Sequence, residues 1–535
     1  MPPKSAISAF TRVVETAGGV FAPGHLGELT QHIPFELVDD VLERSGRVEQ
    51  RLRQLPSRVG MYFLLALVLF PSVGYVRVWD KLVAALQPLG LARPSEKGLR
   101  DLRRRLGAAP VKLLFEVLAG PVARPGAPGV CYRRWRTVAL DGCSSIKAPD
   151  QPRVRGWLGK ILRSNAWDGY PMLRLMALTE TGTRSLLGAV FGPTSYGELT
   201  YARRLLSLLD ADMLLLADRG FDSDDFLTQV VGTRAQLLIR LNGRRTPAVL
   251  ARLPDGSYLT RINGCTLRII EAHIAATCDN GQHIADSYRL ATTLLDHRTD
   301  PAATLVRLYH ERWEVESAFY ALRHTLLDGL VLRSQDPFGL EQEIWAQLTV
   351  YQALRRAMTE ATDTDPSLDP DRASFAIALE TARNQVVTAQ GILPTSPGTG
   401  GIAQAILSGL LPKRRARLSA RKVKSSLSRY PGNPADSRPL TSRNITHLAI
   451  AIYTAQPNTA GQDAPAPTAF LGGQGNRDRT LQLLRTDAHR PWNAKEIADR
   501  LGIDHYRSFC AQLGHWVKDG LLSKAGRGLY ELTAE

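Results

Sequence analysis

The chain is poor in cysteine and lacks the signals of membrane insertion or secretion. Its 535 residues include 5 cysteines that lie far apart and form no CxxC pair, which excludes a disulfide-rich scaffold and argues against a zinc site. The apolar run from Met61 to Phe70 is too short to cross a bilayer and is expected to form a buried helix. The N-terminus also lacks the charged-then-apolar pattern of a signal peptide. These absences predict a cytoplasmic protein with reduced thiols.

Acidic residues are scarce relative to basic ones. The sequence has 51 Asp and Glu against 67 Lys and Arg, a net charge of +16. This excess favours a polyanionic partner, although a basic composition alone is common among soluble proteins. One stretch, Lys413 to Arg429, contains no acid, and we interpret it as a nonspecific contact to DNA phosphates or, alternatively, as a solvated linker. Its cations are Lys413, Arg414, Arg415, Arg417, Arg421, Lys422, Lys424 and Arg429.

Four polar residues recur on one face of a predicted helix. The helix is expected to begin with Asp300 as its N-cap and Pro301 in its first turn, and to extend to about residue 327. Spacings of three, four and seven residues place the four on one face of a 3.6-residue helix. Burying such charges is costly unless the site needs them. The four residues are Tyr309, Arg312, Glu316 and Arg323.

Two aspartates follow apolar runs that are typical of buried strands. Asp141 ends the run from residue 136, and Asp218 ends the run from residue 212. With Glu316 they form an oxygen-rich set suited to Mg²⁺ or Mn²⁺, and sites of this kind hold two ions about 3.5–4 Å apart that act on a phosphodiester. Alternatively, each aspartate is an ordinary turn residue, and Glu316 simply pairs with Arg312 or Arg323.

The order of predicted elements favours an α/β fold with a ribonuclease-H-like catalytic core. Three strands come first, and helices and strands then alternate, which would place the first strand beside the fourth and Asp141 beside Asp218. The acids Asp222, Asp224 and Asp225 suit the start of the second helix. The predicted strands are 136–141, 172–179, 184–191, 212–217 and 235–241, with helices at 197–209 and after residue 222.

Three blocks of sequence resemble the DDE transposases of the insertion-element-four family. The pattern Tyr309-x2-Arg312-x3-Glu316-x6-Arg323 resembles the family signature, with arginine where lysine is usual. Asp218-Arg219-Gly220-Phe221 resembles the block of the second aspartate, and Val138 to Gly142 that of the first. Residues 38–86 also look like the helical N-terminal domain of the family, and the resemblance covers about residues 19–430.

The resemblance implies a cut-and-paste DNA transposase acting on insertion-sequence ends and target DNA. Asp141, Asp218 and Glu316 would be the catalytic residues and hold two Mg²⁺ or Mn²⁺ ions, while four side chains would position phosphate. The partners would be double-stranded DNA in the nucleoid of a bacterium and a second copy of the chain in a synaptic complex, with no membrane contact. A domesticated non-catalytic DNA-binding protein and a metal-dependent nuclease without strand transfer are the alternatives. The positioning residues would be Tyr309, Arg312, Arg323 and Arg219.

The stretch from 243 to 299 is expected to be a β-rich insertion. It alternates apolar and polar residues between turn signals such as Asp255-Gly256. In some relatives a tryptophan of this insertion stacks on a flipped base, but none occurs in this stretch. Tyr258 or Tyr288 could substitute, although packing in the core is the favoured interpretation of both.

The domain plan has five parts. The sequence predicts a helical N-terminal DNA-binding domain at 1–130, the catalytic core at 131–360, a helical and basic loop-rich extension at 361–455, a flexible linker at 456–476 and a small domain at 477–535.

The small C-terminal domain has its own pattern of three helices and a hairpin. Asn493 and Glu496 form a capping box for the second helix, and a hairpin is expected around residues 525–527. This pattern resembles a winged helix-turn-helix domain in which Arg507 and Lys518 of the third helix contact DNA. Binding a protein, or serving only as a stable module, are the alternatives.

Overall fold

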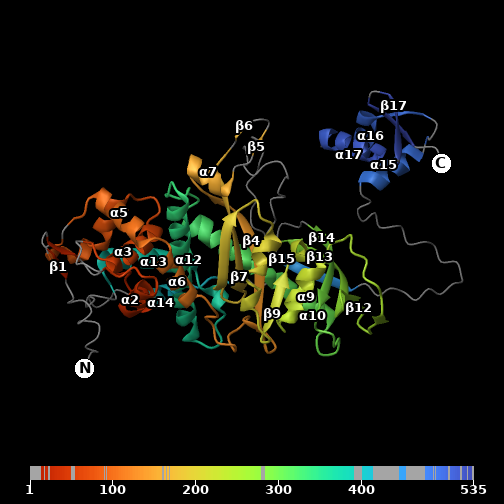
Figure 1. The fold of residues 1–535 in the computed structure, drawn as a ribbon. Coiled ribbons are helices and arrows are strands. Elements are labelled where there is room, and N and C mark those ends of the chain that lie inside the picture. Colours follow the sequence, from red (N-terminus) through yellow and green to blue (C-terminus); the bar gives the residue numbers. More distant parts are fainter. Residues whose placement is uncertain are drawn as a thin grey trace. The chain divides into compact units, whose positions relative to one another are not determined.

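A large mixed β-sheet organises residues 1–455 of the computed structural model, and residues 456–535 form a separate unit (Figure 1). Among the residues described, no helix combines the length and the apolar character that crossing a membrane requires. The structure describes residues 14–16, 19–21, 24–49, 55–89, 91, 93–159, 162–163, 166–167, 169–278, 283–390, 401–413, 445–452, 476–485, 487, 490–503, 506–518, 521–526 and 528–532.

The centre of the sheet has the strand order β8-β7-β4-β9-β10. Strand β4 is antiparallel to β7 and parallel to β9, β7 is antiparallel to β8, and β9 is parallel to β10. This is the strand order of a ribonuclease-H-like core, so the predicted neighbourhood of the first and fourth strands is confirmed. The strands are β4 (Trp135–Lys147), β7 (Met172–Glu180), β8 (Leu186–Pro193), β9 (Met213–Ala217) and β10 (Gln236–Arg240).

Burial explains why the central strands form. All five residues of β9 are buried, as expected for a parallel strand covered by helices on both faces. One face of the sheet packs against the helix α9 (Asp224–Gly232), which Ser223 caps by accepting a hydrogen bond from the Phe226 backbone. The helix predicted at 197–209 is wrong in its length, because α8 (Glu198–Arg203) gives way to the 3₁₀ turn η3 (Leu206–Leu208). The irregular segment buries leucines in the core beneath the sheet.

The sheet continues through the β-rich insertion. Strand β14 (His283–Thr292) pairs with β10, and β13 (Cys265–Cys278) and β12 (Tyr258–Ile262) follow outward, which confirms the predicted strands. The short β11 (Ala251–Arg252) forms the edge. Strand β15 (Ile445–Ile452) pairs with β13, although the sequence predicted only helices and loops there. Its pairing partner lies more than 160 positions away, so no local signal identifies it.

The N-terminal helices pack against a long helix that follows the core (Figure 1). Helix α12 (Pro337–Asp363) and α3 (Ser57–Leu69) are buried along most of their lengths, so the run from Met61 is a core helix as predicted. Arg103, itself buried, connects the two regions because its guanidinium donates hydrogen bonds to Gln342 and Ser334. Further helices of residues 1–455 are α2 (Phe35–Arg44), α4 (Tyr75–Leu82), α5 (Glu96–Leu106), α6 (Ala109–Leu118), α7 (Pro152–Leu158), α13 (Phe375–Thr388) and α14 (Ile402–Ser408).

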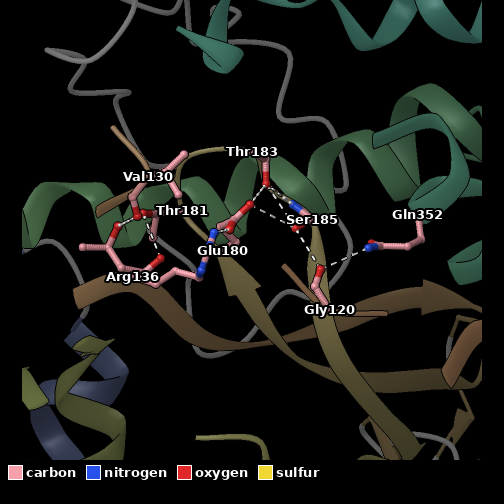
Figure 2. Close-up of polar contacts among 9 residues, drawn as sticks. Gly120, Val130, Arg136, Glu180, Thr181, Thr183, Ser185 and Gln352 are labelled. Atoms are coloured by element: carbon pink, nitrogen blue, oxygen red, sulfur yellow. Dashed lines mark hydrogen bonds and ion pairs between the residues drawn. The ribbon is translucent and has the colours of Figure 1, made fainter. Parts of the chain in front are cut away.

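A buried polar network joins the start of β4 to the end of β7. Figure 2 shows the carboxylate of Glu180, which is fully buried, between the guanidinium of Arg136 and the hydroxyls of Thr183 and Ser185. Arg136 lies on β4 and Glu180 on β7, so the ion pair joins adjacent strands. Gln352 of α12 extends the network by donating to the Gly120 carbonyl (3.4 Å). The network ties the sheet to α12 and thereby holds β4 in place.

In its described residues, the unit at 456–535 contains three helices and a three-stranded sheet. Asn493 caps α16 by accepting a hydrogen bond from the Lys495 backbone, and the sheet has the order β16-β18-β17. Trp492, Phe509 and Leu513 lie in its core. The elements are α15 (Asn476–Arg485), β16 (Trp492–Asn493), α16 (Ala494–Leu501), α17 (Tyr506–Lys518), β17 (Leu522–Gly526) and β18 (Leu529–Leu532).

Candidate active site

The register of two parallel strands brings the two aspartates together. Leu140 and Ala217 form the last paired position of β4 and β9, so Asp141 and Asp218 are the next residues on neighbouring strands. Asp218 follows the end of β9 as predicted, but Asp141 does not end a strand. Strand β4 continues to Lys147 because it keeps pairing with β7 after β9 has ended. Asp141 therefore sits at the edge left open by β9.

The helical segment that carries Glu316 is not one continuous α-helix. It consists of α10 (Ala302–Tyr309), the 3₁₀ turn η5 (His310–Trp313), α11 (Glu314–Tyr320) and the π-helix η6 (Ala321–Leu326). These changes of winding alter which residues share a face, and π-segments often occur at functional sites. The expectation of a single regular face was therefore wrong for the last of the four polar residues.

The start of this segment also differs from the expectation. Pro301, and not Asp300, occupies the N-cap position of α10. Asp300 instead accepts a hydrogen bond from the Tyr132 hydroxyl (2.8 Å) and pairs with Arg133 (2.9 Å). Through these contacts the Asp300 carboxylate holds the start of the helical segment against the hairpin of residues 131–136.

Tyr309 anchors the helical segment to the strand that carries Asp218. Its side chain is buried, and its hydroxyl donates a hydrogen bond to the carbonyl of Ala217 (3.1 Å), one residue before Asp218. Burial raises the pKa of Tyr309 well above its usual value, so the hydroxyl stays protonated and can donate. The predicted site residue is therefore a structural link within the site.

Arg312 lies between two of the three carboxylates. Its Nη1 is 3.5 Å from Oδ2 of Asp141 and 3.9 Å from Oε1 of Glu316, and its side chain is only 3% exposed. The guanidinium also lies 4.8 Å from the centre of the Trp313 ring. Its Nε and Nη1 are buried and have no hydrogen-bond partner among the described residues, which is costly for a cation unless a ligand supplies acceptors.

Electrostatics show that the three carboxylates share one environment. Burial raises the pKa of Asp141 to about 6, although Arg312 and the Gly142 N–H, which donates to Oδ1 (2.7 Å), act to lower it. Glu316 and Asp218 both raise it further, because each adds negative charge nearby. Asp218 also accepts a hydrogen bond from the N–H of Arg219 (2.7 Å). An elevated carboxylate pKa beside other carboxylates is typical of sites that bind cations or transfer protons.

The donor set fits a hard divalent cation. Three carboxylates supply the oxygen ligands that Mg²⁺ and Mn²⁺ prefer. As the side chains stand, no three His, Cys, Asp or Glu residues in the described part of the chain are close enough to hold one ion. Arg312 lies between Asp141 and Glu316, so an ion shared by these two carboxylates would require the guanidinium to move.

The remaining predicted residues lie apart from this group. Arg219 is exposed directly after Asp218. Arg323 belongs to η6 and lines a separate hollow. Lys413 is exposed, and Arg507 lies in α17 of the C-terminal unit. The other cations of the basic run fall outside the described residues, namely Arg414, Arg415, Arg417, Arg421, Lys422, Lys424 and Arg429.

Sequence reasoning missed a fourth carboxylate beside the site. The oxygens of Glu198 lie 3.3 Å and 3.9 Å from the positions that a Cβ would take on Gly142 and Gly220. Glu198 also pairs with Arg174 at 4.0 Å. No signal in the sequence identifies Glu198, because its position depends on how α8 returns to the strand ends.

The two tyrosines considered for base stacking are core residues. Tyr258 is 8% and Tyr288 is 7% exposed, so the favoured interpretation is confirmed for both. Tyr288 packs edge-on against Tyr309, with the Arg240 guanidinium 4.3 Å from its ring centre.

Comparison with known proteins agrees with the geometry. Residues 23–116 match the family described as insertion element 4 transposase N-terminal, and residues 137–353 match the transposase DDE domain, which includes all three carboxylates. The chain belongs to the insertion-element-four family of DDE transposases. It is thus a DNA transposase, an enzyme of DNA cleavage and strand transfer.

Individual relatives show how far this similarity extends along the transposase. It is 23% identical over 430 residues to "Transposase InsG for insertion sequence element IS4" of Escherichia coli K12, covering 77% of this chain and 95% of the relative. It is 29% identical over 201 residues to "Putative transposase InsZ" of the same strain, covering 37% of this chain and 64% of the relative. A solved piggyBac transposase synaptic complex with hairpin DNA shares 9% identity and a TM-score of 0.37 over 72% of this chain and 84% of that chain, a likeness too weak to support an argument.

Proposed function

We propose that Asp141, Asp218 and Glu316 are the catalytic residues of this transposase and together hold two divalent ions, Mg²⁺ or Mn²⁺. The observation that carries the proposal is the register of β4 and β9, which puts both aspartates at one edge of the sheet. Glu316 joins them through its contact with the same guanidinium that contacts Asp141. When bound, such ions activate an attacking oxygen and stabilise the leaving oxygen of a phosphodiester.

The protein's own side chains would position the DNA phosphate. Nε and Nη1 of Arg312 are buried and form no hydrogen bond, although Nη1 is ion-paired with Asp141 and Glu316, so both would donate to an oxygen of the reacting phosphate. Tyr309 fixes the helical segment to the carbonyl of Ala217 and so sets the position of Arg312. Arg219, which is exposed, and Arg323, which is partly buried, lie apart from the carboxylates and would contact neighbouring phosphates. In this scheme the chain cuts at the ends of an insertion sequence and joins the freed end to target DNA by a cut-and-paste route.

The experiment that tests this proposal uses duplex DNA carrying the flanking inverted repeats. Wild type, Glu316→Gln and the surface control Glu360→Gln are assayed with Mg²⁺ for cleavage and for joined product. Glu360 is 69% exposed on α12, so its loss of charge should leave the chemistry intact. Cleavage and joining by wild type and the control, both lost in Glu316→Gln while DNA binding persists, is the expected result.

Other outcomes would favour the alternatives. DNA binding without metal-dependent chemistry in any of the three proteins would point to a non-catalytic DNA-binding protein. Cleavage without joining would point to a nuclease.

The domains flanking the core are proposed to bind DNA. Residues 1–130 would recognise the element ends, and the linker at 456–476 would tether the unit at 477–535. In that unit α16, α17 and the β17–β18 hairpin have the order of a winged helix-turn-helix, with α17 as the recognition helix. Arg507→Gln in the full chain should weaken DNA binding, and unchanged affinity would leave the unit with a structural or protein-binding role.

The proposed partners are double-stranded DNA in the bacterial cytoplasm and a second copy of the chain. Two element ends have to be brought together before joining, so we expect at least a dimer on DNA. The cations from Lys413 to Arg429 would add nonspecific phosphate contacts whose affinity falls with salt.

A further inference from the structure

A small hollow lies beside the helical segment that carries Glu316. It has a volume of ≈ 40 Å³ and opens between the far end of β4 and η6. Its polar lining comes from Ser145 and Lys147 on β4 and from Arg323 and His324 on η6. The rest of the lining is apolar or glycine, and no acidic side chain contributes.

The cations of this hollow have no counter-ion among the described residues. Lys147 and Arg323 form no ion pair with a described acid, and His324 likewise has none. The charged groups acting on His324 are both cations: burial, then Arg323 and then Lys147, lower its pKa below the usual value. Crowded cations without acids repel one another, so an anion bound among them would be stabilised.

The backbone around the hollow departs from regular structure on both sides. A bulge between Cys143 and Ile146 changes the register of β4 against β7 just before Lys147. On the other side, the π-helix η6 ends in a left-handed turn in which Asp328 has φ 54° and Gly329 has φ 65°. The Gly329 N–H donates to the Arg323 carbonyl (2.8 Å), which closes the turn over the hollow. Because of these two irregularities, Lys147 on β4 and Arg323 and His324 on η6 line the same hollow, where a regular strand and a regular helix would orient them differently.

The hollow lies along the same two elements as the catalytic carboxylates. Lys147 is six residues beyond Asp141 on β4, a separation of about 20 Å at roughly 3.3 Å per residue. Arg323 is seven residues beyond Glu316. Since a DNA strand rises about 3.4 Å per nucleotide, the hollow lies within about six nucleotides of a phosphate bound at the carboxylates.

We propose that this hollow is a second phosphate subsite, in which Lys147, His324 and the Ser145 hydroxyl join Arg323 in binding one backbone phosphate of the DNA. The inference rests on the proposed function, because it assumes that DNA reaches the carboxylates. It assigns roles to three residues outside the catalytic group. Lys147 supplies a point charge, His324 a ring N–H donor and Ser145 a hydroxyl donor to the phosphate oxygens. These contacts position the strand and take no part in the chemistry.

The test uses duplexes carrying the element end in which single phosphates are replaced, one at a time, by neutral methylphosphonates. Wild type, Lys147→Gln, His324→Gln and the control Arg298→Gln are compared, with Arg298 as an exposed cation elsewhere on the surface. We expect wild type and the control to lose affinity when one phosphate within about six nucleotides of the cleavage point is neutralised. Lys147→Gln should lose less affinity than wild type on that same replacement, because only Arg323, His324 and Ser145 still contact the phosphate, and the slope of log affinity against log salt should fall by about 0.9 in size.

Two results would overturn the inference. One is a Lys147→Gln protein that keeps the wild-type sensitivity at every neutralised phosphate. The other is a salt slope that changes equally in Lys147→Gln and Arg298→Gln. Neither result bears on the proposed function, which is tested by the loss of cleavage in Glu316→Gln. The phosphate subsite and the proposed function can therefore fail separately. Both variants alter side chains at the surface of the hollow, and their thermal unfolding is to be measured beside wild type to check that each remains folded.

Discussion

Replacing Asp141 with asparagine should stabilise the transposase when no metal is bound. Asp141 is held in a largely buried position beside two other carboxylates, and burial raises its pKa from 3.8 to about 6. The ionised side chain is therefore less stable in the folded protein than in the unfolded chain. Arg312 offsets only part of this cost. An asparagine has nearly the same shape and no charge to bury.

The magnitude follows from the pKa change. A difference of about two units corresponds to about 3 kcal/mol at 1.36 kcal/mol per unit. Because the folded-state pKa is raised, the native state binds this proton more tightly than the unfolded state between pH 3.8 and about 6. Stability from this group is therefore lost as pH rises through that window. The gain on substitution should be about 3 kcal/mol at pH 7 and about 1 kcal/mol at pH 4.5.

The assay is urea unfolding in the presence of a chelator at pH 7 and pH 4.5, followed by a probe of residues 1–455. Asp40→Asn is the matched control, since Asp40 is 54% exposed and its substitution should change stability by less than about 0.5 kcal/mol. If Asp141→Asn is no more stable than wild type at pH 7, or if its gain is unchanged at pH 4.5, the electrostatic reasoning is refuted.

Three further predictions follow from the same structure. Glu180→Gln should destabilise the protein by about 3–5 kcal/mol in urea unfolding, because it leaves Arg136, whose side chain is only 13% exposed, without a counter-ion, and a loss under about 1 kcal/mol would contradict this. Affinity for Mn²⁺ in the absence of DNA, measured by calorimetry, should fall up to about tenfold per pH unit below pH 6, since protons compete with the cation for Asp141; a flat profile would exclude that competition. Tyr309→Phe should cost about 1 kcal/mol of stability by removing the hydrogen bond to Ala217 and should slow cleavage, whereas wild-type values for both would remove the proposed link.

The order of elements in the core could be predicted from local patterns. Apolar runs of five to eight residues between turn signals identified the central strands, and family blocks identified the three acids in chain order. The strand at 213–217 is an example, because a short run of five consecutive apolar residues is typical of a strand that is buried on both faces. The adjacency of Asp141 and Asp218 followed from the expected strand order and the register confirms it.

Features set by tertiary packing could not be predicted. The change from α to 3₁₀ to π winding between 302 and 326 depends on contacts such as the Tyr309 hydrogen bond, which no spacing rule contains. The position of Arg312 between two carboxylates depends on those same changes. Strand β15 forms by pairing with β13, which is far from it in the sequence, so no local pattern predicts it. His324 carried a usable signal, since it directly follows Arg323, but Lys147 did not.

The catalytic assignment is tested most directly by a single-turnover cleavage assay of Asp141→Asn, Asp218→Asn and Glu316→Gln on duplex DNA carrying an element end. Each substitution alone should slow Mg²⁺-dependent cleavage by at least about a thousandfold, because each removes one oxygen ligand from a shared site, while DNA affinity stays within a few fold. If any one of the three variants cleaves within about tenfold of wild type, that residue is not part of the catalytic group and the three carboxylates do not form one metal site.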